Sequence, residues 1–403
     1  MTTPVPATPT FATPLWSSAF RPFYLLGPLY ALVFVTAWLG AYVGAWRPPA
    51  SGVPLALWHG HEMIFGFSAA IITGIVLTAL PSWARTAEIH GSRLALLVAL
   101  WLLGRVAMWG GVWLSPGWVL LLDGALFPAL FVMLAPQLLG TRNRWYLLLL
   151  PILLALAGAN VAFHLAAMTG DAALGGQALR AAVYAIVVLY VLKGGVLTPI
   201  FTGNALREQG RGEQAGFHLG LEVAAVACVV MLALFDLARA PALWVGGAAA
   251  LCALVHGVRT ARWQGWRVAN VPLVLLMHVG FAWLVFAFVL KAVAELTGAV
   301  PEPTWMHAFT VGSLGMMMLG LMLRVSLRHT GRALVVSPAM RLACVLMLGA
   351  ALLRLAATVH DLGAWVVALA ALLWMAPFAI YWAGHAAILI RPSQPRDRAA
   401  SGR

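Results

Sequence analysis

The chain is built from long apolar runs separated by short polar segments. A helix of about 20 apolar residues crosses the roughly 30 Å hydrocarbon core of a bilayer. Helices satisfy their own backbone hydrogen bonds in lipid. Runs of this kind occupy residues 23–43, 58–80, 92–114, 119–139, 146–168, 177–202, 217–238, 241–258, 270–298, 303–324, 338–360 and 363–390. The pattern predicts an all-α, polytopic membrane helix bundle with about twelve transmembrane helices.

Composition supports one membrane domain. The 403 residues are 63% hydrophobic and 9% charged, which is far from the balance of a soluble domain. No polar stretch is long enough to fold as a soluble domain. We therefore expect a short cytoplasmic N-terminal segment at 1–22, a single twelve-span membrane domain at 23–390 and a basic cytoplasmic tail at 391–403.

The cations orient this bundle. Seventeen of the 25 Lys and Arg residues fall in one alternating set of segments, which includes both ends of the chain. Cationic loops stay on the cytoplasmic side, so both termini are expected there, in the inner membrane of a bacterium. The net charge of +13 is then a signal of topology. The expected partner is the lipid bilayer, and no nucleic acid is expected.

Histidine dominates the ionisable residues within the apolar runs. Five of the eleven histidines fall near the outer ends of the predicted helices: His59, His61, His164, His307 and His360. His278 lies about a third of the way in from the cytoplasmic face. Polar groups inside a bilayer are costly and mark candidate functional sites. Because the outer histidines come from four separate helices, their side chains could converge on one site, and they are the stronger candidates.

The run Trp58-His59-Gly60-His61-Glu62-Met63 opens the second predicted span. On a regular helix His59 and His61 point about 200° apart, so they cannot both ligate one ion unless the helix start is unwound at Gly60. The alternatives are two separate centres, or one ligand and one hydrogen-bond partner. Neutral imidazole ligates haem iron and copper, and it needs its second nitrogen held by a carboxylate or carbonyl. Glu62 fits as that partner or as a proton donor. The alternative is a pair of interfacial histidines bonded to water.

Three cations lie deep in predicted helices: Arg105, Arg354 and Lys193. Each costs a few kcal/mol near the bilayer centre unless it is paired. Asp123 lies at a suitable depth to pair with Arg105, while binding of haem propionates is an equal alternative for both arginines. Lys193 precedes Gly194 and Gly195, with Pro199 beyond, and this predicts a broken or kinked sixth helix.

Two further patterns concern helix faces. Asn160 and His164 are four residues apart and share a face that must look into the bundle, where an interhelical hydrogen bond is the expected role. A weak internal repeat is also visible, because His61, Gly66 and Gly74 have the same spacing as His307, Gly312 and Gly320. No Walker loop and no C-x-x-C-H sequence occurs, so any haem is expected to be non-covalent.

Several blocks together resemble one family. They are Phe20-Arg21-Pro22-Phe23, Trp58 to Met63, Leu80-Pro81-Ser82-Trp83, His307 to Gly312 and Arg324-Val325-Ser326-Leu327-Arg328-His329-Thr330-Gly331-Arg332. In these blocks the chain is similar to the NnrS family over nearly its whole length. The resemblance implies a twelve-span protein of nitric-oxide metabolism that contains haem b and copper. It also carries His329 over as a matching position, without a role.

We therefore expect a haem and copper protein that acts on nitric oxide at a metal centre near the outer face, with an unknown electron donor. Its candidate metal ligands are His59, His61, His164, His278 and His307. Glu62 is the candidate proton donor or hydrogen-bond partner, and Arg105 and Arg354 are the candidate haem-propionate partners. Reduction of nitric oxide and simple binding remain open. The competing function is a transporter or channel with its site at Lys193 in the broken sixth helix.

Overall fold

A computed structural model describes residues 13–46 and 53–395, and these residues form helices and no strand. Twelve helical spans are long and apolar enough to cross a membrane. The first six are α1 (Phe20–Tyr42), α2–η2–α3 (Leu55–Ala84), α4 (Gly91–Trp109), α5–α6 (Pro116–Leu139), η3–α7 (Arg144–Thr169) and α8 (Ala172–Glu208). The last six are α9 (Leu219–Leu237), α10 (Ala242–Arg262), α11 (Pro272–Thr297), α12–η5–α13 (Thr304–His329), α14 (Pro338–Val359) and α15 (Ala364–Ile390).

Each span overlaps one of the predicted runs, so the prediction of a twelve-span all-α bundle is confirmed. An even number of spans returns the chain to the face from which it started. Arg21 near the start of α1 donates from Nη1 to the carbonyl oxygens of Leu389 and Arg391, over 2.7 and 2.8 Å. Residues 1–12 and 396–403, in the expected N-terminal segment and tail, lie outside the described residues. The cytoplasmic assignment of this face remains a prediction from charge.

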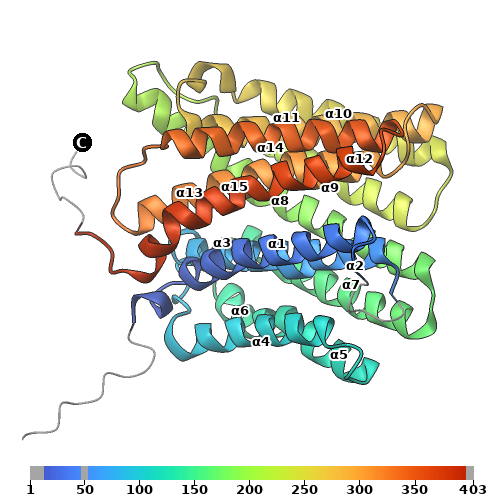
Figure 1. Cartoon of the computed structure of the whole chain (residues 1–403). Coiled ribbons are helices and arrows are strands. Elements are labelled where there is room, and N and C mark those ends of the chain that lie inside the picture. Colours follow the sequence, from blue (N-terminus) through green and yellow to red (C-terminus); the bar gives the residue numbers. More distant parts are fainter. Residues whose placement is uncertain (1–12, 47–52, 396–403) are drawn as a thin grey trace, which may run out of the picture.

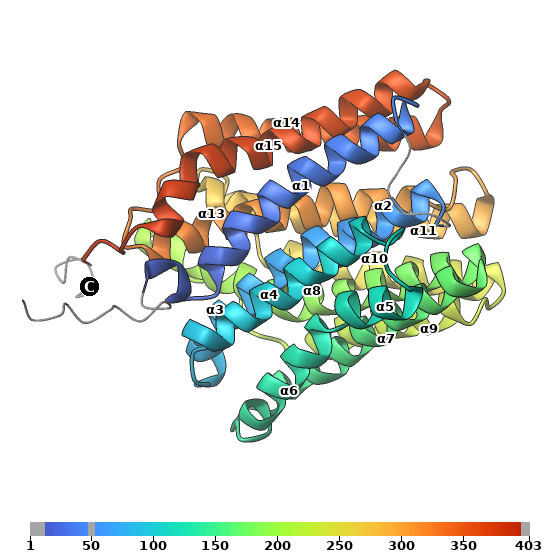
Figure 2. The same ribbon diagram turned by 60° about the horizontal axis from the view of Figure 1, so that its bottom comes forward.

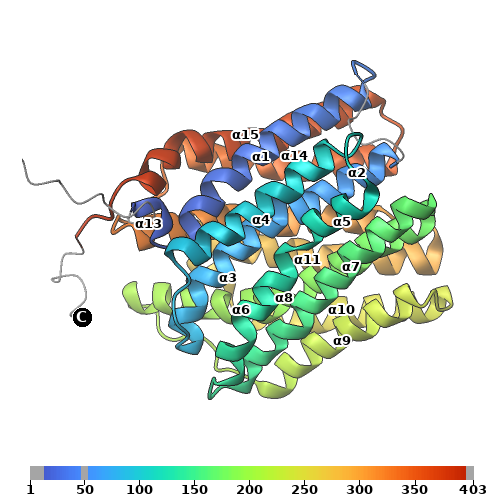
Figure 3. The same cartoon turned by 90° about the horizontal axis from the view of Figure 1, so that it is seen from below.

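The long helices lie side by side with similar axes and form one bundle (Figure 1). Helix α1 lies beside α15, which pairs with α14, and α9 and α10 pack together at another edge (Figures 2 and 3). The most deeply buried spans are Leu55–Ala84, Thr304–His329 and Ala172–Glu208, with 83, 78 and 72% of their apolar windows buried. Most side chains in these three windows are therefore shielded from lipid.

Two of these central spans share an unusual backbone. A seven-residue π-helix, η2 (Glu62–Ser68), begins directly after His61, and a second, η5 (Ala308–Leu314), begins directly after His307. π-Helical turns are rare and occur often at functional sites. The weak repeat in the His-Gly spacing thus corresponds to a repeated local structure.

The sixth span corrects one prediction. Helix α8 is continuous over its 37 residues, with Pro199 inside it, so the predicted break near Lys193 is wrong. The helix packs against α7, α9 and α11 along its length, and two of its hydroxyls bond back to the preceding turn: Thr198 Oγ1 donates to the Gly194 carbonyl over 2.8 Å and Thr202 Oγ1 to the Thr198 carbonyl over 2.7 Å. Proline is tolerated in membrane helices when side chains and neighbouring helices satisfy the freed backbone groups.

Candidate metal centre

His61 is the last residue of α2, and its fully buried side chain faces α7. Its ring stacks on Phe163, with centroids 4.4 Å apart. Nδ1 lies 2.9 Å from Glu62 Oε1, and Nε2 lies 2.9 Å from Asn160 Oδ1 and 3.1 Å from Asp123 Oδ2. Both ring nitrogens therefore face acceptor oxygens.

Asp123, near the end of α5 (Pro116–Gly124), joins the partners of His61 into one cluster. Its Oδ2 accepts hydrogen bonds from Asn160 Nδ2 over 2.9 Å and from His164 Nε2 over 2.8 Å. His61, Asp123 and His164 each offer one ligand atom, and these atoms lie within 4.8 Å of one another. We call these three residues the His/Asp group. All three side chains are buried.

Arg105 of α4 ties the His/Asp group to Glu62. One terminal nitrogen lies 2.6 Å from Glu62 Oε2, and the other is paired with Asp123 Oδ1. Tyr30 of α1 donates its hydroxyl to the same oxygen of Glu62 and accepts from Trp109 Nε1 over 3.0 Å. The pairing of Arg105 with Asp123 expected from their depth is confirmed, and both terminal nitrogens of Arg105 are engaged by protein carboxylates.

The charges of this cluster do not cancel without a further cation. Two carboxylates face one guanidinium, which leaves one negative charge where lipid and protein exclude water. An unbalanced buried charge costs several kcal/mol. A proton on His61 restores neutrality and matches its surroundings, since both ring nitrogens then donate. A bound metal ion restores the balance in the same place.

His59 and His307 lie in a second cluster. His59 points toward α1, where its ring lies 4.2 Å from that of Trp38, and its buried Nδ1 has no hydrogen-bond partner among the described residues. His307 Nδ1 lies 3.1 Å from the Pro303 carbonyl oxygen, and its Nε2 accepts from Arg354 over 2.9 Å. His59 is close enough to His307 and Arg354 for electrostatic interaction.

The candidate histidines therefore separate into two clusters at one end of the bundle. The opposite orientations expected for His59 and His61 are confirmed, because the two rings pack on α1 and α7 respectively. His278 is in neither cluster; its Nε2 lies 2.8 Å from Thr202 Oγ1, and its ring packs closely against Gly265. His360 lies exposed at the end of α14.

One buried charge cluster was missed by the sequence analysis. Lys291 Nζ is fully buried and lies 2.8 Å from Asp236 Oδ1, 2.8 Å from Glu295 Oε1 and 3.1 Å from Glu302 Oε1. Lys291 lies near the end of a long apolar run. Glu295 and Glu302 are close to it in sequence, whereas Asp236 lies on α9. An aspartate inside the apolar run of α9 was the available signal. Arg180 also pairs with Asp236 and Glu302, so two cations face three carboxylates. Glu295 and Glu302 are partly exposed, unlike Glu62 and Asp123.

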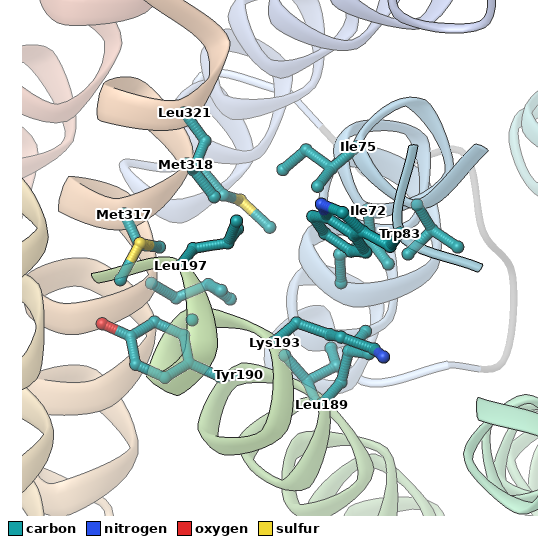
Figure 4. Close-up of a pocket in the computed structure, with 14 residues that line it drawn as sticks. Ile72, Ile75, Trp83, Leu189, Tyr190, Lys193, Leu197, Met317, Met318 and Leu321 are labelled. Atoms are coloured by element: carbon teal, nitrogen blue, oxygen red, sulfur yellow. The ribbon is translucent and has the colours of Figure 1, made fainter. Parts of the chain in front are cut away.

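Lys193 borders a small apolar cavity of about 60 Å³ between α3, α8 and α13. Figure 4 shows its amino group below Trp83, on the side away from Met317 and the Tyr190 hydroxyl. The ammonium lies 4.3 Å from the centre of the Tyr146 ring, within the range of a cation–π contact. This contact partly compensates the burial of Lys193.

The fold and the buried cluster define a multi-span helical membrane protein with a possible metal site formed by His and Asp. The family model described as NnrS protein matches residues 14–393. The chain belongs to the NnrS family, which is linked to the response to nitric oxide, and the resemblance found in the sequence is confirmed. A search of curated proteins finds no match to this chain.

Proposed function

We propose that this protein binds copper and b-type haem near the starts of the spans Leu55–Ala84 and Thr304–His329, and acts there on nitric oxide. The action is binding of the gas or its reduction to nitrous oxide. The observation that supports the proposal best is the buried His/Asp group, whose surroundings carry one uncompensated negative charge.

The residues of the His/Asp group fit a copper ion. Asp123 Oδ2 lies 3.1 Å from His61 Nε2 and 2.8 Å from His164 Nε2. These distances are close to the roughly 3.3 Å between tetrahedral ligands at bonds of about 2.0 Å. Imidazole is a good copper ligand. Glu62 accepts from His61 Nδ1 and so directs the Nε2 lone pair toward the ion, as in a carboxylate–histidine–metal arrangement.

Charge favours the monovalent form of copper. With neutral imidazoles, a single positive charge brings the cluster of Arg105, Glu62 and Asp123 to neutrality, whereas a divalent ion leaves an excess of one. Binding copper(I) in place of the proton on His61 changes no net charge inside the membrane. We therefore expect copper binding to release about one proton per site.

The second cluster fits a haem by its residue types. His307 donates from Nδ1 to the Pro303 carbonyl, so its lone pair is on Nε2, which accepts from Arg354 here and would exchange that hydrogen bond for the metal. His59 offers a buried, unpartnered Nδ1 between aromatic rings. Arg354 beside His307 is suited to a propionate. In this proposal His59 and His307 are the haem ligands, and Arg105 acts only within the copper cluster.

When bound, haem and copper would supply the site that holds nitric oxide and would pass on the electrons for its reduction. Two molecules of nitric oxide, two protons and two electrons give one nitrous oxide and one water. The chain contributes Glu62, which holds the tautomer of His61 and is the candidate for delivering a proton. The electrons come from a donor outside the chain.

A transporter or channel is the weaker alternative. Its site was placed at a break in the sixth span, and α8 is continuous there. The cavity beside Lys193, at about 60 Å³, is also small for a transported solute.

The test is metal analysis of the purified protein with single histidine variants. We expect a Soret band and copper in the unmodified protein, loss of copper in His61→Gln, and loss of haem in His307→Gln. The exposed His360→Gln variant is the matched control and should keep both. Absence of both the Soret band and copper from the unmodified protein would overturn the proposal. Nitrous oxide formed from nitric oxide with an added electron donor distinguishes reduction from binding.

A further inference from the structure

A second, larger cavity lies at the end of the bundle where both described ends of the chain meet. It has a volume of about 430 Å³, within the range of small-molecule sites. Its walls come from the last turns of α8 and α10, the segment 214–218 and the start of α9. The cationic loops assign this end to the cytoplasmic face.

The cavity is positively charged. Three arginines line it, namely Arg207, Arg259 and Arg262, against one carboxylate, Glu222. Arg259 is buried and pairs with Glu222 through Nε, over 3.1 Å, and through Nη2. Arg262 has no hydrogen-bond or ion-pair partner among the described residues, and Arg207 contacts only the neutral amide of Asn204, over 2.5 Å. Two positive charges are therefore free to meet an anion.

Gln214 adds a second, independent sign of a ligand. This residue lines the same cavity, and both polar atoms of its amide are buried without a hydrogen-bond partner. An unpaired buried amide costs about 1–3 kcal/mol. Both atoms are closed to solvent in this conformation, so the amide must turn into the cavity that its side chain lines to bond a ligand with oxygen acceptors or hydroxyl groups.

Apolar side chains also line the cavity, and their surface continues onto the outside of the bundle. Val196, Ile200 and Phe217 line the cavity and are 46, 50 and 72% exposed. Trp266 is 67% exposed in the neighbouring turn η4 (Gly265–Val268), and tryptophan is enriched at membrane–water interfaces. A free anion would contact only the arginines, whereas an anionic amphiphile would contact both the arginines and the apolar side chains.

From these observations we propose that this cavity binds an anionic phospholipid of the cytoplasmic leaflet. The phosphate lies between Arg207 and Arg262, the Gln214 amide bonds to headgroup oxygens, and an acyl chain runs along Val196, Ile200 and Phe217. Basic pockets between transmembrane helices on the cytoplasmic side are suited to anionic headgroups. The site is separate from the metal clusters at the other end of the bundle.

The test uses the full chain, purified in detergent and titrated with phosphatidylglycerol, phosphatidylcholine or inorganic phosphate. Bound lipid is counted by native mass spectrometry. We expect phosphatidylglycerol to bind in preference to phosphatidylcholine. The Arg207→Gln/Arg262→Gln variant should bind it about 30-fold more weakly, which corresponds to about 2 kcal/mol for the two arginines together. Arg142→Gln/Arg341→Gln removes two exposed arginines from the same face, away from the cavity, and should bind as the unmodified protein does.

A further variant tests the amide. Gln214→Leu should weaken binding of phosphatidylglycerol without lowering the melting temperature of the lipid-free protein, because it removes an unpaired buried group. Equal binding of phosphatidylglycerol by the Arg207→Gln/Arg262→Gln variant and the unmodified protein would overturn the proposal. Competition by inorganic phosphate at the same concentration as the lipid would also overturn it, and would identify the occupant as a free anion.

Discussion

The spans Leu55–Ala84 and Thr304–His329 each contain a π-helix of seven residues that begins directly after a histidine. The residue after the histidine differs, since it is Glu62 in one span and Ala308 in the other. The partners differ accordingly. His61 faces two carboxylates and an amide, whereas His307 faces a backbone carbonyl and the guanidinium of Arg354.

This difference separates what the backbone supplies from what the side chains supply. The repeated π-helix follows each histidine directly and brings a glycine against a neighbouring helix. Only the first copy gathers excess negative charge, and therefore only that copy calls for a cation. The two copies thus suit different groups, a copper ion at His61 and a haem at His307.

The largest expected effect comes from the arginine of the first cluster. Arg105→Gln leaves Glu62 and Asp123 as two buried carboxylates without their cation, which costs about 3–5 kcal/mol in the free energy of unfolding. Arg354→Gln removes one hydrogen bond to a neutral ring and should cost about 1 kcal/mol. Denaturant unfolding in detergent measures both.

A double variant controls for simple loss of packing at Arg105. In Arg105→Gln/Asp123→Asn one negative charge remains, as in the unmodified cluster, so part of the lost stability should return. Equal destabilisation by Arg105→Gln and Arg354→Gln would show that the charge difference between the two clusters has no energetic role.

Glu62→Gln should affect only the first copy. The amide keeps the size of the side chain but is a poorer acceptor for His61 Nδ1–H, and loss of such a partner typically weakens metal binding by 10- to 100-fold. On the proposed function, copper affinity falls by about that factor while haem content stays constant. Copper titration of the purified variant, with the Soret absorbance as internal control, measures both. A parallel fall in haem would contradict the assignment of the two clusters to different groups.

The sequence predicted the spans well, because the length of an apolar run determines whether a helix can cross a bilayer. It also predicted that the side chains of His59 and His61 point in opposite directions, since 3.6 residues per turn fix the angle between two positions on a helix. The break in α8 was predicted wrongly. Glycine and proline weaken a helix locally, but packing of α8 against α7, α9 and α11 supports it.

The contacts of the site were harder to predict. Depth in the membrane was enough to pair Arg105 with Asp123, but it did not place Asp123 against His61 and His164. The spacing of Asn160 and His164 turned that face of α7 into the bundle, but the neighbours of the face and the rotation of α5 about its axis follow from no periodic pattern. The spacing of histidine and glycine hinted at a repeat, and the π-helices became visible only in the structure.

The glycines inside the two π-helices test whether the copies pack alike. A Cβ at position 312 would lie 2.5 Å from Trp283 Cδ2, so Gly312→Ala should cost about 1–3 kcal/mol by overpacking and leave copper unchanged. A Cβ at position 66 would lie 2.6 Å from Tyr30 Cε1 and 3.1 Å from Glu62 Oε2. Gly66→Ala should therefore cost a similar amount and also weaken copper binding. Unfolding and copper titration of both variants separate these outcomes.

The smallest effect is expected where the two copies already diverge. A Cβ at position 320 would meet Leu276 Cβ at 3.3 Å, whereas one at position 74 would meet Tyr24 Cε1 at 2.9 Å and Phe23 Cβ at 3.1 Å. Alanine is favoured over glycine in a helix by about 1 kcal/mol, which offsets a slight contact but not a close one. Gly320→Ala should thus leave the free energy of unfolding within about 0.5 kcal/mol of the original, while Gly74→Ala lowers it by about 1 kcal/mol. Equal losses in the two variants would mean that the copies share their packing down to the second glycine, and that only their charges distinguish them.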